Sequence, residues 1–169
     1  MSAPAPHVLP PDEELPLFVY GTLMTGFRNY EKLLAAYIKE TRPAYIEDVS
    51  LWHIKEAGYP VIVAGTGIVK GELVILKDFA AAMPELDRLE GYTGDPHEST
   101  YVRLIKLVAD PETGEETDAH VYWYNRSLAE ISGPVVEIRG GDWRVFMDEE
   151  TLHEGMQVLR DQEPEPAGE

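Results

Sequence analysis

The side chain in this sequence whose surroundings best suit proton transfer is the carboxylate of Glu90. On a helix, Glu90 falls one turn beyond Leu86. The same face carries Met83 and Phe79, so it forms an apolar stripe that ends in a carboxylate. Glutamate is rarely buried without a partner, and loss of water favours its neutral form. We therefore expect burial to raise the pKa of Glu90 toward neutrality, where the group can take up and return a proton.

Glu90 also has a structural interpretation. It could end the helix, or it could form an ion pair with Arg88 or Arg103. The negative charge of a glutamate in the last turn of a helix interacts unfavourably with the helix dipole, however. A solvated position without a function could carry a different residue at little cost. The place of Glu90 at the helix end therefore favours a functional carboxylate.

A short loop after Tyr20 is the second segment that could do chemistry. The apolar run from Leu17 to Tyr20 predicts a buried strand that stops at Gly21. Glycine allows the next backbone N–H groups to turn outward into an anion-binding concavity, to which the Thr22 hydroxyl adds a donor. Such a concavity could hold a carboxylate. The structural alternative is an ordinary strand-to-helix turn.

Several other kinds of chemistry lack their usual residues. The sequence has no cysteine, which excludes thiol nucleophiles and thiolate metal sites, and its five histidines never pair at metal-ligand spacing. The glycines in residues 65–71 do not fit a dinucleotide loop, and no Walker loop or G-x-S-x-G elbow is present. We therefore expect no metal and no other cofactor.

The charge balance bears on the partners of the protein. The 169 residues include 14 Lys and Arg against 31 Asp and Glu, a formal net charge of −17. Such a surface repels phosphate backbones, so we expect no nucleic-acid partner. No segment approaches the run of about 18 apolar residues that a membrane span requires. With neither cysteines nor a signal-peptide pattern, the sequence predicts a cytoplasmic protein that does not bind membranes, and it leaves the oligomeric state open.

The chain is long enough for one domain and too short for two ordinary ones. Residues 1–15 and 158–169 are rich in Pro, Glu and Ala, and we interpret them as a flexible arm and an acidic flexible tail. The intervening residues 16–157 are expected to form the single domain.

The elements that must position Glu90 and the loop are mostly strands. A helix is predicted over residues 27–37, with Pro43 marking the exit from that segment, and a second helix over residues 78–90, stopped by Gly91. Proline is well tolerated only in the first turn of a helix, so Pro84 leaves open whether the second helix is one piece or two. Strands are predicted at 49–53, 61–64, 68–76, 101–109, 119–124 and 135–139, the fourth and fifth as a hairpin. This pattern predicts an α+β fold, mainly antiparallel, arranged as a meander or small barrel.

Taken together, these segments resemble the gamma-glutamylcyclotransferase-like family, of the gamma-glutamylamine cyclotransferase type. The resemblance covers about residues 17 to 146. Its motifs, in the family's order, are FVYGTL (18–23), GYP (58–60), VKGE (69–72), LDRLEGY (86–92), YVR (101–103), VYWY (121–124) and GDW (141–143). Pro84, inside the helix that carries Glu90, departs from the pattern and leaves the start of that helix open.

The resemblance implies a small, mainly antiparallel β-barrel flanked by helices, with a substrate cavity at the YGTL loop and a catalytic glutamate at Glu90. It implies a cofactor-free enzyme that converts a gamma-glutamyl amine or peptide into 5-oxoproline and a free amine. The α-amine of the substrate attacks its own side-chain carbonyl, so no enzyme nucleophile is needed, and Glu90 acts as general acid and base. The residues expected to bind this small-molecule substrate are Tyr20, Gly21, Thr22, Leu23, Tyr59, Tyr101 and Arg103.

Some of these roles have alternatives. Arg103 could bind the substrate or pair with a structural acidic residue, and Tyr59 could line the cavity or simply pack in the core. The same cavity could also serve an enzyme acting on another small amide, or a non-catalytic module that binds a small carboxylated metabolite.

Overall fold

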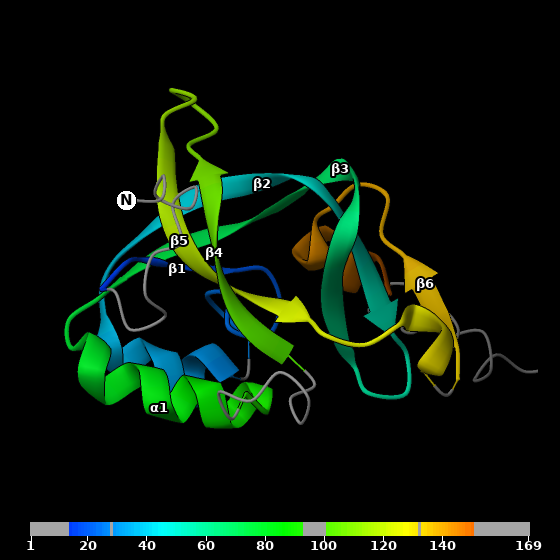
Figure 1. Ribbon diagram of the computed structural model, residues 1–169, viewed down its shortest axis with the longest axis horizontal. Helices are drawn as coiled ribbons and strands as arrows, with labels where there is room; N and C mark the ends of the chain where they lie inside the picture. The colour runs from blue at the N-terminus through cyan, green and yellow to red at the C-terminus, as the bar shows by residue number, and fades with distance from the viewer. Residues whose placement is uncertain (1–13, 28, 93–100, 132, 151–169) are drawn as a thin grey trace, which may run out of the picture.

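Five strands close into a barrel in the computed structural model of the protein (Figure 1). The structure describes residues 14–27, 29–92, 101–131 and 133–150. The barrel strands are β1 (Leu17–Val19), β2 (Ile38–Ile54), β3 (Tyr59–Leu76), β4 (Tyr101–Ala109) and β5 (Glu116–Tyr124). They follow the order β3-β1-β5-β4-β2, and β2 pairs again with β3 to close the ring. Neighbouring strands are antiparallel except β1 and β5, which run parallel.

A sixth strand, β6 (Val135–Glu137), pairs with the end of β2 from Trp52 to Ile54. The predicted α+β class and small, mainly antiparallel barrel are therefore confirmed. The predicted hairpin is also present, as the antiparallel pair of β4 and β5, which runs from Tyr101 opposite Tyr124 to Ala109 opposite Glu116.

β2 and β3 form one long hairpin, where the sequence predicted several short strands. They span 17 and 18 residues and pair from Ile38 opposite Leu76 to Ile54 opposite Tyr59. Pro43 lies inside β2, not at the exit from a helical segment. Proline is tolerated where a strand has a free edge, and the other edge of β2 has no partner at Pro43 in the described part of the chain.

Two glycines that were expected to separate strands lie within β3 instead. Gly65 and Gly67 sit beside the bulge of β2 at Val49, where the two strands approach closely. A Cβ at Gly65 would lie 2.8 Å from the Cβ of Ser50. These glycines therefore permit close strand contact at the bulge, and the strand continues through them.

The helix that carries Glu90, α1 (Phe79–Glu90), is a single piece. The side chain of Asp78 accepts a hydrogen bond from the Ala81 N–H at 3.1 Å and caps its start. Gly91 ends it in the left-handed conformation, with φ of 72°, as predicted. Pro84 lies inside this helix, which is continuous. The predicted end of the helix is confirmed, and the open question of one piece or two is answered as one.

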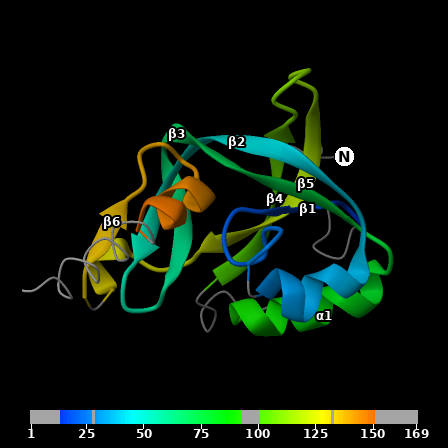
Figure 2. The same ribbon diagram turned by 180° about the vertical axis from the view of Figure 1, so that it is seen from behind.

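The predicted helix over residues 27–37 is shorter and less regular than expected. A π-helical turn, η1 (Tyr30–Leu34), is followed by a 3₁₀ turn, η2 (Ala35–Tyr37), and the chain then enters β2 directly. Seen from either side, these turns and α1 lie side by side along the barrel (Figure 2). Another 3₁₀ turn, η3 (Leu128–Glu130), follows β5, and residues 143–150 are helical.

The hydrophobic core fills the barrel and continues beneath α1. Its largest fully buried side chains include Trp143, Phe18, Leu17, Leu34, Leu51, Ile62 and Leu86.

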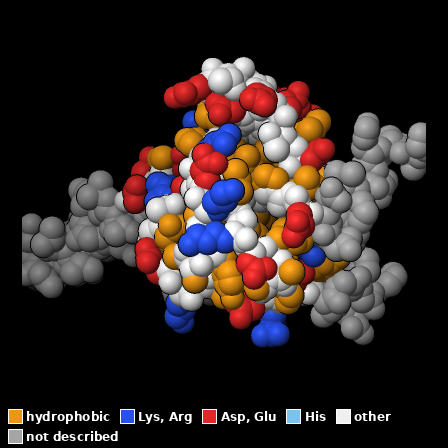
Figure 3. Space-filling view, turned by 90° about the vertical axis from the view of Figure 1, so that its left-hand side faces the viewer, with side chains coloured by type: hydrophobic (Ala, Val, Ile, Leu, Met, Phe, Trp, Pro, Cys, Tyr) orange, Lys and Arg blue, Asp and Glu red, His pale blue; other side chains and the backbone are white. Residues whose placement is uncertain are grey.

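On the outside, acidic side chains are spread widely over the face shown in Figure 3, with apolar side chains between them. No described helix is long and apolar enough to cross a membrane. The predicted tail at 158–169 and residues 1–13 of the predicted arm lie outside the described residues.

We expect Gly71→Ala to destabilise the protein because β1 and β3 touch at this glycine. A Cβ at Gly71 would lie 2.2 Å from the carbonyl oxygen of Val19, which is backbone and cannot rotate away. The free energy of unfolding in urea should fall by about 1–3 kcal/mol. Gly140→Ala is the matched control, since nothing lies within 4 Å of a Cβ there. Equal stability of the two variants would contradict the close approach.

Candidate active site

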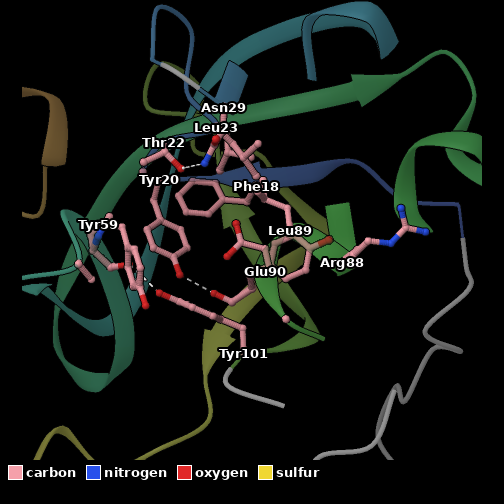
Figure 4. A pocket seen from close by; sticks show the side chains of 16 residues that line it. Phe18, Tyr20, Thr22, Leu23, Asn29, Tyr59, Arg88, Leu89, Glu90 and Tyr101 are labelled. Carbon is pink, nitrogen blue, oxygen red and sulfur yellow. Dashed lines mark hydrogen bonds between the residues drawn. The ribbon is translucent and has the colours of Figure 1, made fainter. Parts of the chain in front are cut away.

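A cavity of about 460 Å³ opens where β1 ends and α1 ends (Figure 4). The loop of residues 20–23 forms one wall, and the last turn of α1 forms the wall opposite. The tyrosines of β3, β4 and β5 lie between these walls. The lining residues are Phe18, Val19, Tyr20, Gly21, Thr22, Leu23, Asn29, Ala57, Tyr59, Pro60, Arg88, Leu89, Glu90, Gly91, Tyr101 and Tyr122.

Glu90 points its carboxylate into this cavity (Figure 4). The side chain is partly buried, and loss of water raises the pKa of Glu90 from 4.5 to about 7. Within the described residues, no hydrogen bond or ion pair holds the carboxylate. Arg88, one of the two arginines considered as a partner, is exposed and points away from the cavity (Figure 4). The arrangement is therefore that of a carboxyl group able to exchange a proton near neutral pH.

The other arginine, Arg103, is held by a different carboxylate. Its Nε and one terminal nitrogen lie 2.9 and 3.1 Å from the two oxygens of Asp87, one turn before Glu90 on α1. The hydroxyl of Tyr122 donates to the same Asp87 carboxylate at 2.8 Å. The pair is largely buried, with side-chain exposures of 8% for Arg103 and 18% for Asp87. Arg103 does not line the cavity, so the structure places it in the ion-pair alternative.

Two of the tyrosines that line the cavity, Tyr20 and Tyr101, have their hydroxyl hydrogens engaged by backbone carbonyls. Tyr20 donates to the backbone carbonyl of Tyr122, and Tyr101 donates to the carbonyl of Pro60 at 3.1 Å. Burial raises the pKa of Tyr20 and of Tyr101, and the nearby Glu90 charge adds to both shifts. These phenols therefore stay neutral, and they offer the cavity apolar ring surface and lone pairs.

The loop wall offers backbone donors. Gly21 packs against Pro60, where a Cβ would lie 2.8 Å from the ring Cγ, so this position needs a glycine. No backbone hydrogen bond between described residues uses the N–H groups of Gly21, Thr22 or Leu23. All three residues line the cavity opposite Glu90. In the part of the chain that the structure describes, these N–H groups have no backbone partner, so they are suited to bind an anionic group.

The structure brings most of the predicted site residues to one cavity. Glu90, Tyr20, Gly21, Thr22, Leu23, Tyr59 and Tyr101 all line it, whereas Arg103 does not. Sequence reasoning missed Asn29, Tyr122 and the role of Asp87. A signal existed for Asp87, which lies three residues before Glu90 on the helix, but none marked Asn29. Among the described residues, no group of three His, Cys, Asp or Glu side chains could hold a metal ion.

The raised pKa of Glu90 predicts a pH-dependent difference in stability. The folded protein binds the Glu90 proton more tightly than the unfolded chain, so ionisation of Glu90 lowers stability as the pH rises from 4.5 to about 7. Glu90→Gln removes this cost. We expect the variant to match the wild type below pH 4.5 and to exceed it by about 3 kcal/mol at pH 8, measured by urea unfolding. A difference that does not change with pH would contradict the shift.

Removal of the Asp87 carboxylate should destabilise the fold strongly. Asp87→Asn leaves the buried charge of Arg103 without this partner, and we expect a loss of about 3 kcal/mol in the free energy of unfolding. Glu40→Gln breaks an exposed pair with Arg42, whose side chains are about half exposed, and should cost less than about 1 kcal/mol. Losses of the same size in both variants would contradict a buried anchor at Asp87.

Comparison with known proteins places the chain in a family. A family model described as gamma-glutamyl cyclotransferase, AIG2-like, matches residues 17–145. No curated protein matches the chain.

Three solved structures show a similar fold. An AIG2-like protein from Mus musculus is 23% identical, with a TM-score of 0.54 over 71% of this chain and 84% of that chain. A protein from Arabidopsis thaliana is 16% identical, with a TM-score of 0.55 over 89% and 95%. An uncharacterized protein from Pyrococcus horikoshii is 20% identical, with a TM-score of 0.54 over 82% and 98%. Because the family model spans the chain from β1 into the helical residues 143–150, the protein belongs to the AIG2-like gamma-glutamyl cyclotransferase family.

Proposed function

We propose that the protein is a cofactor-free cyclotransferase that converts a gamma-glutamyl amine or peptide into 5-oxoproline and a free amine. One observation carries the proposal. The desolvated carboxylate of Glu90, without an ion-pair partner among the described residues, faces the free N–H groups of residues 21–23 across a cavity in a member of this family. A carboxylate that can exchange protons and an anion-binding wall are what an intramolecular cyclisation of a glutamyl group requires.

In the proposed reaction, the backbone N–H groups of Gly21, Thr22 and Leu23 bind the α-carboxylate of the substrate. Ionised Glu90 takes a proton from the α-ammonium group, and the resulting amine attacks the side-chain carbonyl carbon to close a five-membered ring. As the bond to the departing nitrogen breaks, Glu90 returns its proton to that nitrogen. The second proton that the ring nitrogen loses ends on the released amine, which leaves as an ammonium ion.

The environment of Glu90 suits this double role. A carboxyl group with a pKa of about 7 is present in both protonation states at neutral pH, so it can act as base in the first step and as acid in the second. The tyrosine rings that line the cavity limit its contact with water and help hold the substrate in a folded shape.

The proposal is tested by incubating the protein with a panel of gamma-glutamyl amines and dipeptides and measuring 5-oxoproline by mass spectrometry. We expect product from at least one member of the panel, and Glu90→Gln should lower kcat by about 10²- to 10⁴-fold. Glu47→Gln, an exposed change on β2, is the matched control and should keep full activity.

Two outcomes would contradict the proposal. One is the absence of product from every panel member, and the other is equal turnover by Glu90→Gln. If gamma-glutamyl compounds raise the melting temperature without turnover, the cavity belongs to a binding module, because a ligand that binds only the native state stabilises it.

A further inference from the structure

We propose that Asn29 is a positioning residue for substrate binding, which turns the hydroxyl of Thr22 into a hydrogen-bond donor for the α-carboxylate of the glutamyl group. This inference rests on the proposed function, and it adds a side-chain donor to the backbone N–H groups of the loop. Asn29 was not singled out by any motif of the sequence, and only its place in the fold brings it to the cavity.

The contact between the two side chains is direct. The Asn29 amide nitrogen Nδ2 donates to the Thr22 hydroxyl oxygen at 2.6 Å, and Figure 4 shows this bond at the top of the cavity. Both side chains are partly buried and both line the cavity. The backbone holds them together as well, because the N–H of Tyr30 donates to the carbonyl of Thr22 at 3.1 Å.

The direction of this hydrogen bond decides what Thr22 can do. A hydroxyl has one hydrogen to donate and lone pairs to accept with, whereas the Asn NH₂ group can only donate. Since the Thr22 oxygen accepts from Asn29, its own hydrogen stays available, and no hydrogen bond within the described residues takes it. A carboxylate only accepts hydrogen bonds, so it is the ligand that this hydroxyl suits.

The side chain of Asn29 does not cap the helical turn that follows it, as an Asn at this position commonly does. Asn29 occupies the N-cap position of η1, where Asn commonly accepts a bond from a backbone N–H of the helix. Here the side chain makes no cap hydrogen bond, and its amide is directed to Thr22 instead. The Asn29 amide, which could otherwise stabilise the turn, thus forms a hydrogen bond in the cavity wall.

The opposite wall of the cavity has the opposite hydrogen-bonding character. The Glu90 carboxylate faces the cavity there, and Tyr101, which lies between the two walls, gives its hydroxyl hydrogen to a backbone carbonyl. With donors at the loop and an acceptor at the end of α1, the α-carboxylate and the α-ammonium group of an amino acid can bind in only one orientation. The carboxylate lies at Thr22, and the ammonium group lies at Glu90.

Asn29→Asp provides the sharpest test because it reverses the hydrogen bond. An aspartate accepts the Thr22 hydrogen and places a negative charge beside the substrate carboxylate. We expect KM to rise by about 10- to 100-fold while kcat changes by less than about threefold. Asn29→Ala should raise KM less, since it adds no charge. In the double variant with Thr22→Val it should have almost no further effect, because both act through one donor. Thr66→Val, an exposed change on β3, is the control.

A binding measurement separates this inference from the proposed catalysis. We would titrate 5-oxoproline and 2-pyrrolidone, which is the same ring without the carboxylate, into wild type and variants and follow them by NMR. The wild type should prefer 5-oxoproline, and Asn29→Asp should remove the preference while its binding of 2-pyrrolidone stays the same. This result supports the role of Asn29 even if the panel of substrates gives no turnover. KM and product affinity within twofold of the wild type in Asn29→Asp, or a loss confined to kcat, would overturn the inference.

Discussion

The site depends on one carboxylate that is kept out of water without an ion-pair partner in the described structure. Glu90 has this property because the nearest buried arginine, Arg103, is already bound by Asp87 one turn earlier on the same helix. If Arg103 turned to Glu90, the pKa of Glu90 would fall, and a permanently ionised group could not return a proton near neutrality. The Asp87–Arg103 pair therefore does two things: it fixes α1 against β4, and it leaves Glu90 free to titrate.

The barrel brings this carboxylate to the loop of residues 20–23. β1 is only three residues long and lies between β3 and β5, so the loop that follows it leaves from the middle of the sheet. Close contacts at Gly71 and Gly21 set β1 and the loop against β3. The last turn of α1 then closes the same cavity from outside the barrel. Two segments about 70 residues apart thereby form opposite walls, one with donors and one with acceptors.

The similar solved structures share the fold of this protein, and a shared fold does not by itself determine function. Identities of 16–23% accompany an architecture that extends over most of each chain. What this chain does with the architecture depends on which side chains enter the cavity and how their hydrogen bonds run. Here these are a protonatable carboxyl, two tyrosines with their hydroxyl hydrogens engaged, and a Thr hydroxyl that accepts a hydrogen bond from an Asn amide.

The sequence by itself determined the features that local interactions control. Asp78 caps the start of α1 with its side chain, and Gly91 ends the helix through its backbone N–H, both within a few residues. The apolar spacing of the helix places Glu90 on its buried face. The sequence could not decide between partners that lie far apart along the chain. Whether Arg103 meets Asp87, Glu90 or the substrate, whether Asn29 caps its own turn or reaches Thr22, and whether β2 continues through Pro43 all depend on how the barrel closes. Only the tertiary structure settles these choices, because each partner is locally compatible and long-range packing selects one of them.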